Sequence, residues 1–357
     1  MVNSSEFRPS TKLKALKAIE HVKSFLVLTM IALALTVIPL SPPVSAQPLN
    51  SWSSTTSYPT GIASTGIASQ SCATNSGFIY CVGGTSPSPT SAVYFAPITS
   101  SGVGPWTLSA FPYGAPAVPT GVPTSEHSCV TDSGFIYCVG GGTNLVFFAP
   151  ITSSGVGPWT LSAFPYGAPA VPTGVPIERE SCVTNSGFIY CVGGFDGSMV
   201  VSDVFFAPIS SSGVGPWTST TSYPIFISEQ SCVTNSGFIY CVGGNPSLPT
   251  SAVYFAPISS SGVGTWTPTT SYPFSITEQS CVARASFVFC VGGLSFPIGP
   301  TIDVFFAPIS SSGVGTWTST NSYPFTIFEQ SCVTRASLIY CVGGNPPILP
   351  TSAVFFG

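Results

Sequence analysis

The amino-acid sequence predicts an all-β protein: a six-bladed β-propeller with four antiparallel strands per blade, closed by an N-terminal strand that completes the last blade. Two recurring features support this prediction. Six pairs of cysteines, each nine positions apart, are followed at once by Val-Gly-Gly, and six tryptophans recur with a similar period of 49–58 residues. That period is the length of a four-stranded blade. Nothing in the repeats shows helical periodicity.

The first 46 residues differ from the repeats that follow. Five of the eight basic residues lie within residues 1–23, an apolar run covers residues 25–40, and small residues precede Gln47. This order is typical of a secretory signal cleaved after Ala46. The alternative is an uncleaved anchor with residues 24–41 in the membrane, although a span needs about 20 apolar residues. The sequence thus predicts a signal over residues 1–46 and a secreted or cell-surface propeller over residues 47–357.

The fourth repeat shows how each blade is expected to form. Residues 231–235 and 238–242 are short, β-rich segments separated by Ser-Gly, which predicts an inner hairpin. A third strand is expected over residues 252–258. Trp266 opens a fourth strand, which ends near the Tyr-Pro pair that follows it.

The order of these segments predicts how the ring closes. The first Trp segment, around Trp52, precedes every cysteine hairpin, and the chain ends on a third strand at residues 353–356. The Trp52 segment is therefore expected to supply the fourth strand of the last blade. Joining the two ends in this way leaves no open sheet edge.

The two cysteines of each pair are predicted to face each other. A two-residue turn in the fourth repeat places Cys232 opposite Cys241 at a non-hydrogen-bonded position, where the backbones approach to about 4.5 Å. An exported chain with an even number of cysteines favours disulfides; twelve reduced, buried cysteines are the alternative. Zinc is not expected, because the pairs lie on separate blades. The predicted disulfides are Cys72–Cys81, Cys129–Cys138, Cys182–Cys191, Cys232–Cys241, Cys281–Cys290 and Cys332–Cys341.

The repeat resembles the kelch repeat over residues 51–357. It has a hairpin that ends in a double glycine, then an aromatic-Pro strand, then a tryptophan. The third strand, Tyr-Phe-Ala-Pro-Ile at residues 254–258, is similar to that of kelch-like repeats in secreted or cell-surface prokaryotic proteins. It departs from the family in having Phe-Ala-Pro where Tyr-Asp-Pro is usual. The resemblance implies a β-propeller, a fold that serves binding modules and some enzymes and so does not choose a function.

Charge composition excludes some function classes. Residues 47–357 carry three Arg, no Lys and ten acidic residues, a net charge of −7. With no basic patch, nucleic-acid binding is not expected. General acid–base, nucleophilic or metal catalysis needs His, Lys, free Cys or clustered carboxylates, and this region holds one His and no Lys. We therefore expect a non-enzymatic protein without metal or cofactor. Acid–base action of paired Glu on a glycan is a less favoured alternative.

The repeats differ in polar character just before the first strand of each hairpin. This strand lines the channel of a propeller, so the side chains two and three positions before the first cysteine are expected to ring one mouth. Such a ring suits a cation, a sugar or a polar peptide end; the alternative is that these groups hydrogen-bond strand ends and hold water. Ser69 and Gln70 hold these positions in the first repeat. The candidate ligand-binding residues are Glu126, His127, Arg179, Glu180, Glu229, Gln230, Glu278, Gln279, Glu329 and Gln330.

Loops are expected to surround the same mouth. The connections into the first three hairpins are long, and two of them, at residues 111–123 and 164–176, are apolar and rich in proline. The loops after Val-Gly-Gly vary most between repeats. Both sets emerge on one face, which predicts a contact surface.

These features lead to two hypotheses about function. The first is an extracellular binding or adhesion module for a glycan or a protein, which uses the loop face. The second is a self-assembling subunit of a coat or filament, because low charge removes the repulsion that keeps proteins apart. The one-sided loop face favours the first.

Overall fold

A computed structural model of the chain describes residues 48–49, 51–59, 66–86, 88–109, 125–143, 145–163 and 177–357. All of them belong to one compact unit, Ala46–Gly357. The predicted signal with its membrane segment, and the loops at 111–123 and 164–176, lie outside the described residues. Among the residues described, no helix is long and apolar enough to cross a membrane.

The described residues form antiparallel β-sheets and no helix, as the sequence predicts. Each cysteine pair lies on a hairpin. The first strands of the hairpins are β2 (Ser71–Asn75), β7 (His127–Asp132), β12 (Ser181–Asn185), β17 (Ser231–Asn235), β23 (Ser280–Arg284) and β30 (Ser331–Arg335). The second strands are β3 (Phe78–Val82), β8 (Phe135–Gly140), β13 (Phe188–Val192), β18 (Phe238–Val242), β24 (Phe287–Val291) and β31 (Leu338–Val342).

Two further strands extend each hairpin outward. The resulting sheet has four strands in the last repeat and five in each of the others, where a short fold-back strand is added. The third strands are β4 (Val93–Thr99), β9 (Leu145–Thr152), β14 (Val204–Ser210), β19 (Val253–Ser259), β27 (Val304–Ser310) and β32 (Val354–Phe356). The fourth strands are β6 (Thr107–Ser109), β11 (Thr160–Ala163), β16 (Thr218–Ser219), β21 (Thr267–Pro268), β29 (Thr318–Ser319) and β1 (Ser53–Ser54). In the last sheet, β1 pairs with β32, so the two ends of the compact unit share one sheet.

Several short strands were not expected from the sequence. Five Gly-Val pairs fold back on the end of the third strand: β5 (Gly102–Val103), β10 (Gly155–Val156), β15 (Gly213–Val214), β20 (Gly262–Val263) and β28 (Gly313–Val314). A separate small sheet joins two loops of the fifth repeat through β22 (Ile276–Thr277), β25 (Leu294–Ser295) and β26 (Gly299–Pro300).

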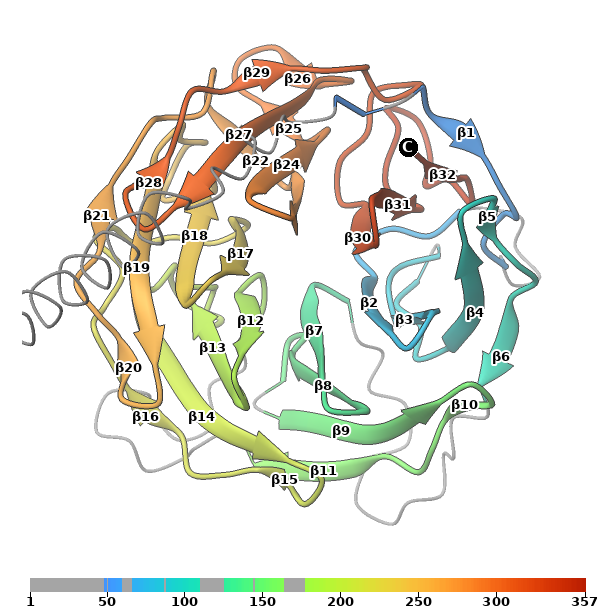
Figure 1. Cartoon of the computed structure of the whole chain (residues 1–357), viewed down its shortest axis with the longest axis horizontal. Coiled ribbons are helices and arrows are strands. Elements are labelled where there is room, and N and C mark those ends of the chain that lie inside the picture. The colour runs from blue at the N-terminus through green and yellow to red at the C-terminus, as the bar shows by residue number, and fades with distance from the viewer. Residues whose placement is uncertain are drawn as a thin grey trace, which may run out of the picture. The chain divides into compact units, whose positions relative to one another are not determined.

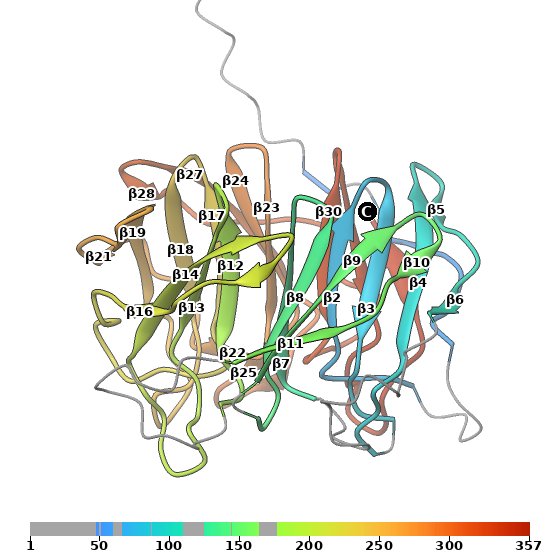
Figure 2. The same cartoon turned by 90° about the horizontal axis from the view of Figure 1, so that it is seen from below.

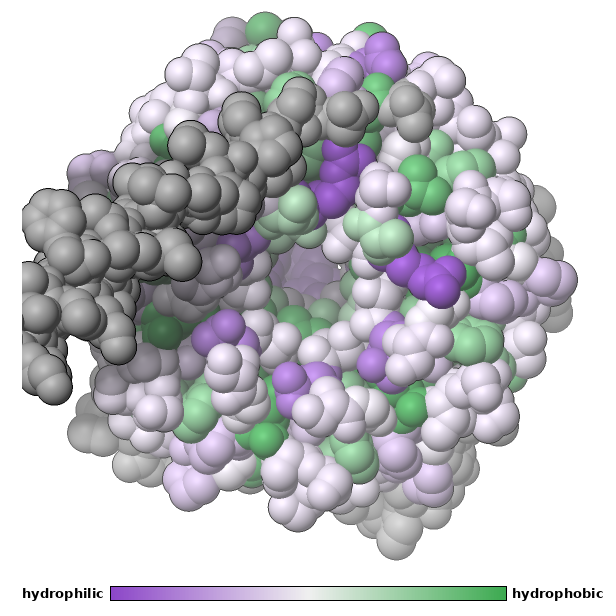
Figure 3. Space-filling view, viewed as in Figure 1, coloured by the Kyte–Doolittle hydropathy of each residue, from purple (hydrophilic) through white to green (hydrophobic). Residues whose placement is uncertain are grey.

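The sheets follow one another around a central axis, with the first strand of each hairpin innermost (Figure 1). Seen side on, the hairpin turns lie at one end of the axis, and β22 and β25 lie at the other (Figure 2). We call this second end the loop face. A hollow opens at the centre of the hairpin-turn face (Figure 3).

The cysteine register is confirmed in all six hairpins. Cys232 pairs directly with Cys241, and the six disulfides have Cα–Cα distances of 4.0–4.1 Å. The described residues contain no free cysteine. Ser236 and Gly237, with φ of 49° and 80°, form the two-residue turn that sets this register. Six disulfides indicate that the protein folds in an oxidising environment.

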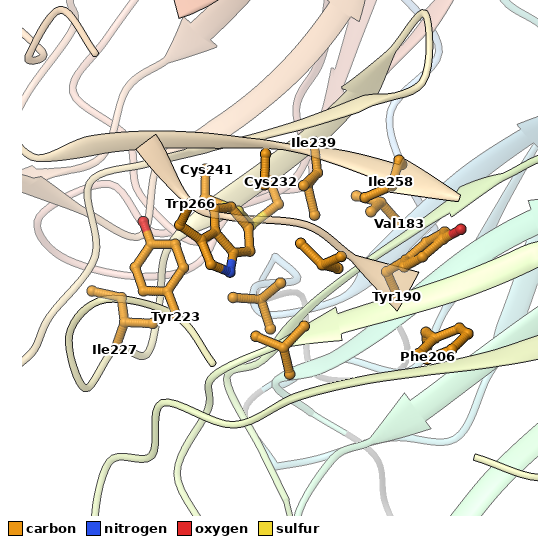
Figure 4. Close-up of a cluster of buried hydrophobic side chains, with 14 residues drawn as sticks. Val183, Tyr190, Phe206, Tyr223, Ile227, Cys232, Ile239, Cys241, Ile258 and Trp266 are labelled. Atoms are coloured by element: carbon orange, nitrogen blue, oxygen red, sulfur yellow. A yellow bond between two sulfur atoms is a disulfide. The ribbon is translucent and has the colours of Figure 1, made fainter. Parts of the chain in front are cut away.

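Hydrophobic side chains fill the spaces between neighbouring sheets. In the cluster of Figure 4, Val183, Tyr190 and Phe206 of the third repeat pack against Cys241 and Trp266 of the fourth. Another cluster joins the last repeat to the first in the same way. The six disulfides therefore lie inside the joints between sheets, where each contributes to packing as well as to chain constraint.

Hydrogen bonds cross the same joints. The hydroxyl of Tyr240 donates to the carbonyl oxygen of Ser310 in the following sheet at 2.8 Å, and Tyr340 of the last repeat donates to Thr99 of the first at 2.6 Å. Each first cysteine donates its N–H to a serine Oγ of the preceding repeat, at 2.8–3.0 Å. For Cys72 that acceptor is Ser331, so this series of contacts also runs around the whole ring.

Candidate functional site

The structure brings all the predicted candidate residues together around one cavity. The cavity has a volume of about 160 Å³ and lies at the channel mouth on the loop face. Each repeat supplies the two residues that lie two and three positions before its first cysteine. The lining residues are Ser69, Gln70, Glu126, His127, Arg179, Glu180, Glu229, Gln230, Glu278, Gln279, Glu329 and Gln330.

The outer layer of this cavity, three positions before each cysteine, is fixed by a closed ring of backbone hydrogen bonds. Each residue donates its N–H to the carbonyl oxygen of the equivalent residue in the preceding repeat, at 2.9–3.2 Å, and Ser69 donates to Glu329. All six residues have φ of 54–61°, a left-handed conformation in which glycine is least strained. None of them is glycine, so side chains are retained here at a cost of about 1 kcal/mol or more each.

The inner layer, two positions before each cysteine, consists mainly of buried glutamines. Gln70, Gln230, Gln279 and Gln330 each donate Nε2 to a valine carbonyl oxygen of the preceding repeat, at 2.6–2.7 Å. These bonds fix the amide orientation and leave each Oε1 without a hydrogen-bond partner within the described chain. The invariant glycine pair makes room for this contact: a Cβ on Gly243 would come within 2.5 Å of the Ile276 carbonyl oxygen and 2.9 Å of Gln279 Nε2.

Two repeats carry different residues in this layer. The Glu180 carboxyl lies over Gly140, as the Gln230 amide lies over Gly193 in the next repeat. Burial raises the pKa of Glu180 to about 8, and the nearby Glu178 carboxylate adds to the shift. His127 is also enclosed, and burial lowers its pKa to about 4. Both side chains are therefore neutral near pH 7.

One arginine pairs with two of the four glutamates in the outer layer. Arg179 Nε lies 2.8 Å from a Glu126 carboxylate oxygen, and its Nη1 lies 3.0 Å from a Glu229 carboxylate oxygen. Hydrogen bonding to Glu126 raises the pKa of Arg179 further above its usual range. A guanidinium that bridges two carboxylates holds both in place and offsets one of their two negative charges.

The other half of the outer layer has no basic residue. Glu329 Oε2 accepts hydrogen bonds from Ser69 Oγ and Asn345 Nδ2, both at 2.7 Å. Glu278 Oε2 has no hydrogen-bond partner among the described residues. Burial, with the charges of Glu329 and Glu229, raises the pKa of Glu278 to about 8.

Comparison with known proteins bears on the fold. No protein-family model matches the chain, and no curated protein matches it in sequence. Solved structures do match: one of them, described as "Structure of YjhT", has a TM-score of 0.61 and 13% sequence identity, and the match covers 82% of this chain and 95% of that chain. The chain has a β-propeller-like fold. At this level of identity the similarity says nothing further.

The β-propeller-like fold places exposed apolar side chains around the acidic mouth. Nine large hydrophobic side chains are exposed among the described residues, and eight of them lie on loops of the loop face. Only Leu108 lies elsewhere within that set, on β6. The eight, which we call the apolar rim, are Met199, Phe226, Leu248, Phe296, Ile298, Ile302, Ile348 and Leu349.

A metal centre is not formed by the one grouping of metal-ligand atoms among the described residues. His127 lies near Cys129 and Cys138, but their sulfur atoms are joined in a disulfide and so are not available as thiolates. The lining of the cavity is instead rich in oxygen atoms, with carboxylates in the outer layer and unpartnered glutamine oxygens beneath them. This arrangement suits a ligand with hydrogen-bond donors.

Proposed function

We propose that the six sheets are the blades of a six-bladed propeller that β1 closes, built from kelch-like repeats. The support comes from contacts that recur at every joint. The backbone ring at the channel mouth returns from Glu329 to Ser69, and β1 completes the sheet of β32. A chain whose two ends share one sheet leaves no exposed edge there.

We further propose that this propeller is a secreted or cell-surface binding module for a protein or glycan, and not an enzyme. The main support is that two features lie on the same face: the polar cavity, and eight of the nine large hydrophobic side chains that are exposed among the described residues. Monomeric soluble proteins rarely gather exposed apolar side chains on one face unless it is a contact surface. The neutral, enclosed His127 and the absence of lysine from the repeats argue against acid–base chemistry.

Replacing two side chains of the apolar rim is expected to weaken binding. The double variant Ile298→Ser/Ile348→Ser replaces the two most exposed side chains of the rim, 83% and 88% exposed, and is expected to fold normally because neither is packed. Binding is measured on arrays of extracellular glycans and surface proteins. We expect the variant to lose at least tenfold in affinity for the partners found, about 1.4 kcal/mol or more. The variant Leu108→Ser is the matched control, and equal losses in both variants would contradict a role for this face.

A second candidate function is self-assembly into a coat or filament, which the low charge of residues 47–357 favours. Negative-stain electron microscopy of the exported protein distinguishes the two. We expect discrete rings with six lobes at about pH 5 and about pH 8, since the binding function needs no polymer. Ordered filaments or sheets would make the loop face an assembly contact, and rings with another number of lobes would contradict the proposed six blades.

A further inference from the structure

Three carboxylate oxygens at the channel mouth have no hydrogen-bond partner within the described chain: both oxygens of Glu180 in the inner layer, and Glu278 Oε2 in the outer layer. Glu278 Oε2 is buried and has no hydrogen-bond partner there, whereas Glu126 and Glu229 are bound to Arg179, and Glu329 is held by Ser69 and Asn345. Buried carboxylate oxygens without donors are costly, so this position is one that a cationic group would stabilise.

Buried amide oxygens independently point to a donor-rich ligand at the same place. Gln279 and Gln330 are each 5% exposed and line the cavity. Their Nε2 atoms are bound to valine carbonyl oxygens, which leaves both Oε1 atoms unsatisfied within the described chain. Acceptors without donors beneath an unpaired carboxylate make a site that lacks only hydrogen-bond donors and positive charge.

Two loops of the apolar rim are attached directly to this part of the mouth. Thr277, next to Glu278, pairs with Leu294 at the start of the loop that carries Phe296 and Ile298. In the last repeat, Asn345 donates to Glu329 and begins the loop whose tip is Ile348 and Leu349. Exposed apolar groups therefore lie on the loops attached to Glu278 and to its neighbour Glu329.

We propose that the mouth beside Glu278 binds one primary ammonium group, a lysine side chain or a free N-terminal amine, of an extracellular protein partner whose apolar neighbours contact the loops at Phe296–Ile298 and Ile348–Leu349. The ammonium supplies the three N–H donors that Glu278 and the glutamine oxygens lack. This inference rests on the proposed binding function and names the chemistry of its partner.

Other ligand classes fit the site less well. A divalent cation takes six or more oxygen ligands and usually several carboxylates, whereas three of the four glutamates in the outer layer are already hydrogen-bonded. Anions are repelled by the excess of glutamates over the single Arg179. The cavity volume of about 160 Å³ is below the roughly 300–1,000 Å³ of pockets that hold a whole small molecule. It suits the end of one side chain, with the remaining contacts outside on the rim.

Proton release is expected to accompany binding. Burial, then the charges of Glu329 and Glu229, raises the pKa of Glu278 to about 8; Arg179 lowers it and Glu126 raises it. An ammonium group favours the ionised carboxylate, so binding displaces the proton. Affinity should therefore increase as the pH rises from about 6 to about 9, where lysine remains charged because its pKa is about 10.4.

Three capped tripeptides test this proposal with the exported protein by isothermal titration calorimetry. They are acetyl-Leu-Lys-Leu-amide, acetyl-Leu-norleucine-Leu-amide and Leu-norleucine-Leu-amide with a free amine. We expect the lysine peptide to bind at least about tenfold more tightly than the acetylated norleucine peptide, as a charge-assisted hydrogen bond would give. The free-amine peptide shows whether an N-terminal amine serves equally.

Glu278→Gln is expected to abolish this preference for the ammonium, and Asp132→Asn, on the hairpin-turn face, is the control with the same change in net charge. Equal affinity for the lysine and acetylated norleucine peptides, or equal loss in both variants, would overturn the ammonium site. Tight binding of calcium chloride that Glu278→Gln removes would also overturn it, in favour of a cation centre. The proposed binding function is judged separately, because the Ile298→Ser/Ile348→Ser variant tests the loop face whatever the tripeptides do.

Discussion

Replacing Glu180 by glutamine is expected to raise the thermal midpoint of the protein by several degrees at about pH 8.5 and to change it little at about pH 4. Glutamine at this position donates to a valine carbonyl oxygen in four other repeats. An ionised Glu180 carboxylate has no hydrogen to donate to a carbonyl oxygen. An unsatisfied buried group costs about 1–3 kcal/mol. At low pH the protonated carboxyl has its own O–H to donate, so the two side chains become nearly equivalent.

The direction of this pH dependence follows from the raised pKa of Glu180, about 8 in the folded protein against an ordinary value of 4.5. The contribution is fully present below about pH 4.5, where folded and unfolded chains both hold the proton. It is lost as the pH rises towards about 8, because the unfolded chain gives up its proton first.

A reverse substitution supplies the control for Glu180→Gln. Gln230→Glu places a carboxyl at the equivalent position of the fourth repeat and should lower the midpoint at about pH 8.5 by a similar amount. Glu278, whose pKa is raised in the same way, leaves a residual slope that Glu180→Gln/Glu278→Gln reduces. Burial also raises the pKa values of Glu178, Asp203 and Glu329, so a smaller slope remains. Differential scanning fluorimetry across this pH range measures both effects. A Glu180→Gln variant that is no more stable at high pH than at low pH, relative to the parent, would contradict the assignment.

Reduction of the six disulfides is expected to unfold the protein at room temperature. Each closes a loop of about ten residues and contributes roughly 2–3 kcal/mol in the chain-entropy model. Even if the six contributions add only in part, their sum is comparable to the whole free energy of unfolding of a domain, about 5–15 kcal/mol. The urea midpoint should therefore fall to near zero when reduction is complete by mass.

A single-pair variant separates chain constraint from packing. Cys232→Ser/Cys241→Ser removes one disulfide from an inter-sheet cluster and should cost about 2–5 kcal/mol, since both positions are buried. Cys232→Ala/Cys241→Ala keeps an apolar side chain at each position and should cost less, because no hydroxyl is buried. If complete reduction left the urea midpoint unchanged, the disulfides would have no part in stability.

Much of the fold follows from the sequence because the repeats constrain one another. A two-residue turn fixes which residues face each other, so the opposition of Cys232 and Cys241 can be predicted by counting. The same counting places the residues before each first cysteine at one mouth, since equivalent positions in a ring of repeats share one height along the axis.

The remaining features depend on distances that counting does not provide. Nothing in the sequence indicates that Arg179 reaches two carboxylates while Glu278 Oε2 has no hydrogen-bond partner among the described residues. The third strand of the fourth repeat runs over Val253–Ser259, one residue later than predicted, because Ser259 pairs with Gly262 in the unexpected fold-back strand β20. Some signal for β20 was present, since a Ser-Ser turn precedes the Gly-Val pair.

The series of serine contacts between repeats has a consequence for how such a molecule can change over generations. Every junction includes the same donor and acceptor, a cysteine N–H and a serine Oγ, and so does the junction of Cys72 with Ser331. A copied repeat therefore brings with it both the donor and the acceptor of this contact. The side chain two positions before this serine takes no part in the contact, so it differs between repeats as serine, glutamate or arginine. The positions that join neighbouring repeats are thus different from the positions that vary at the channel mouth.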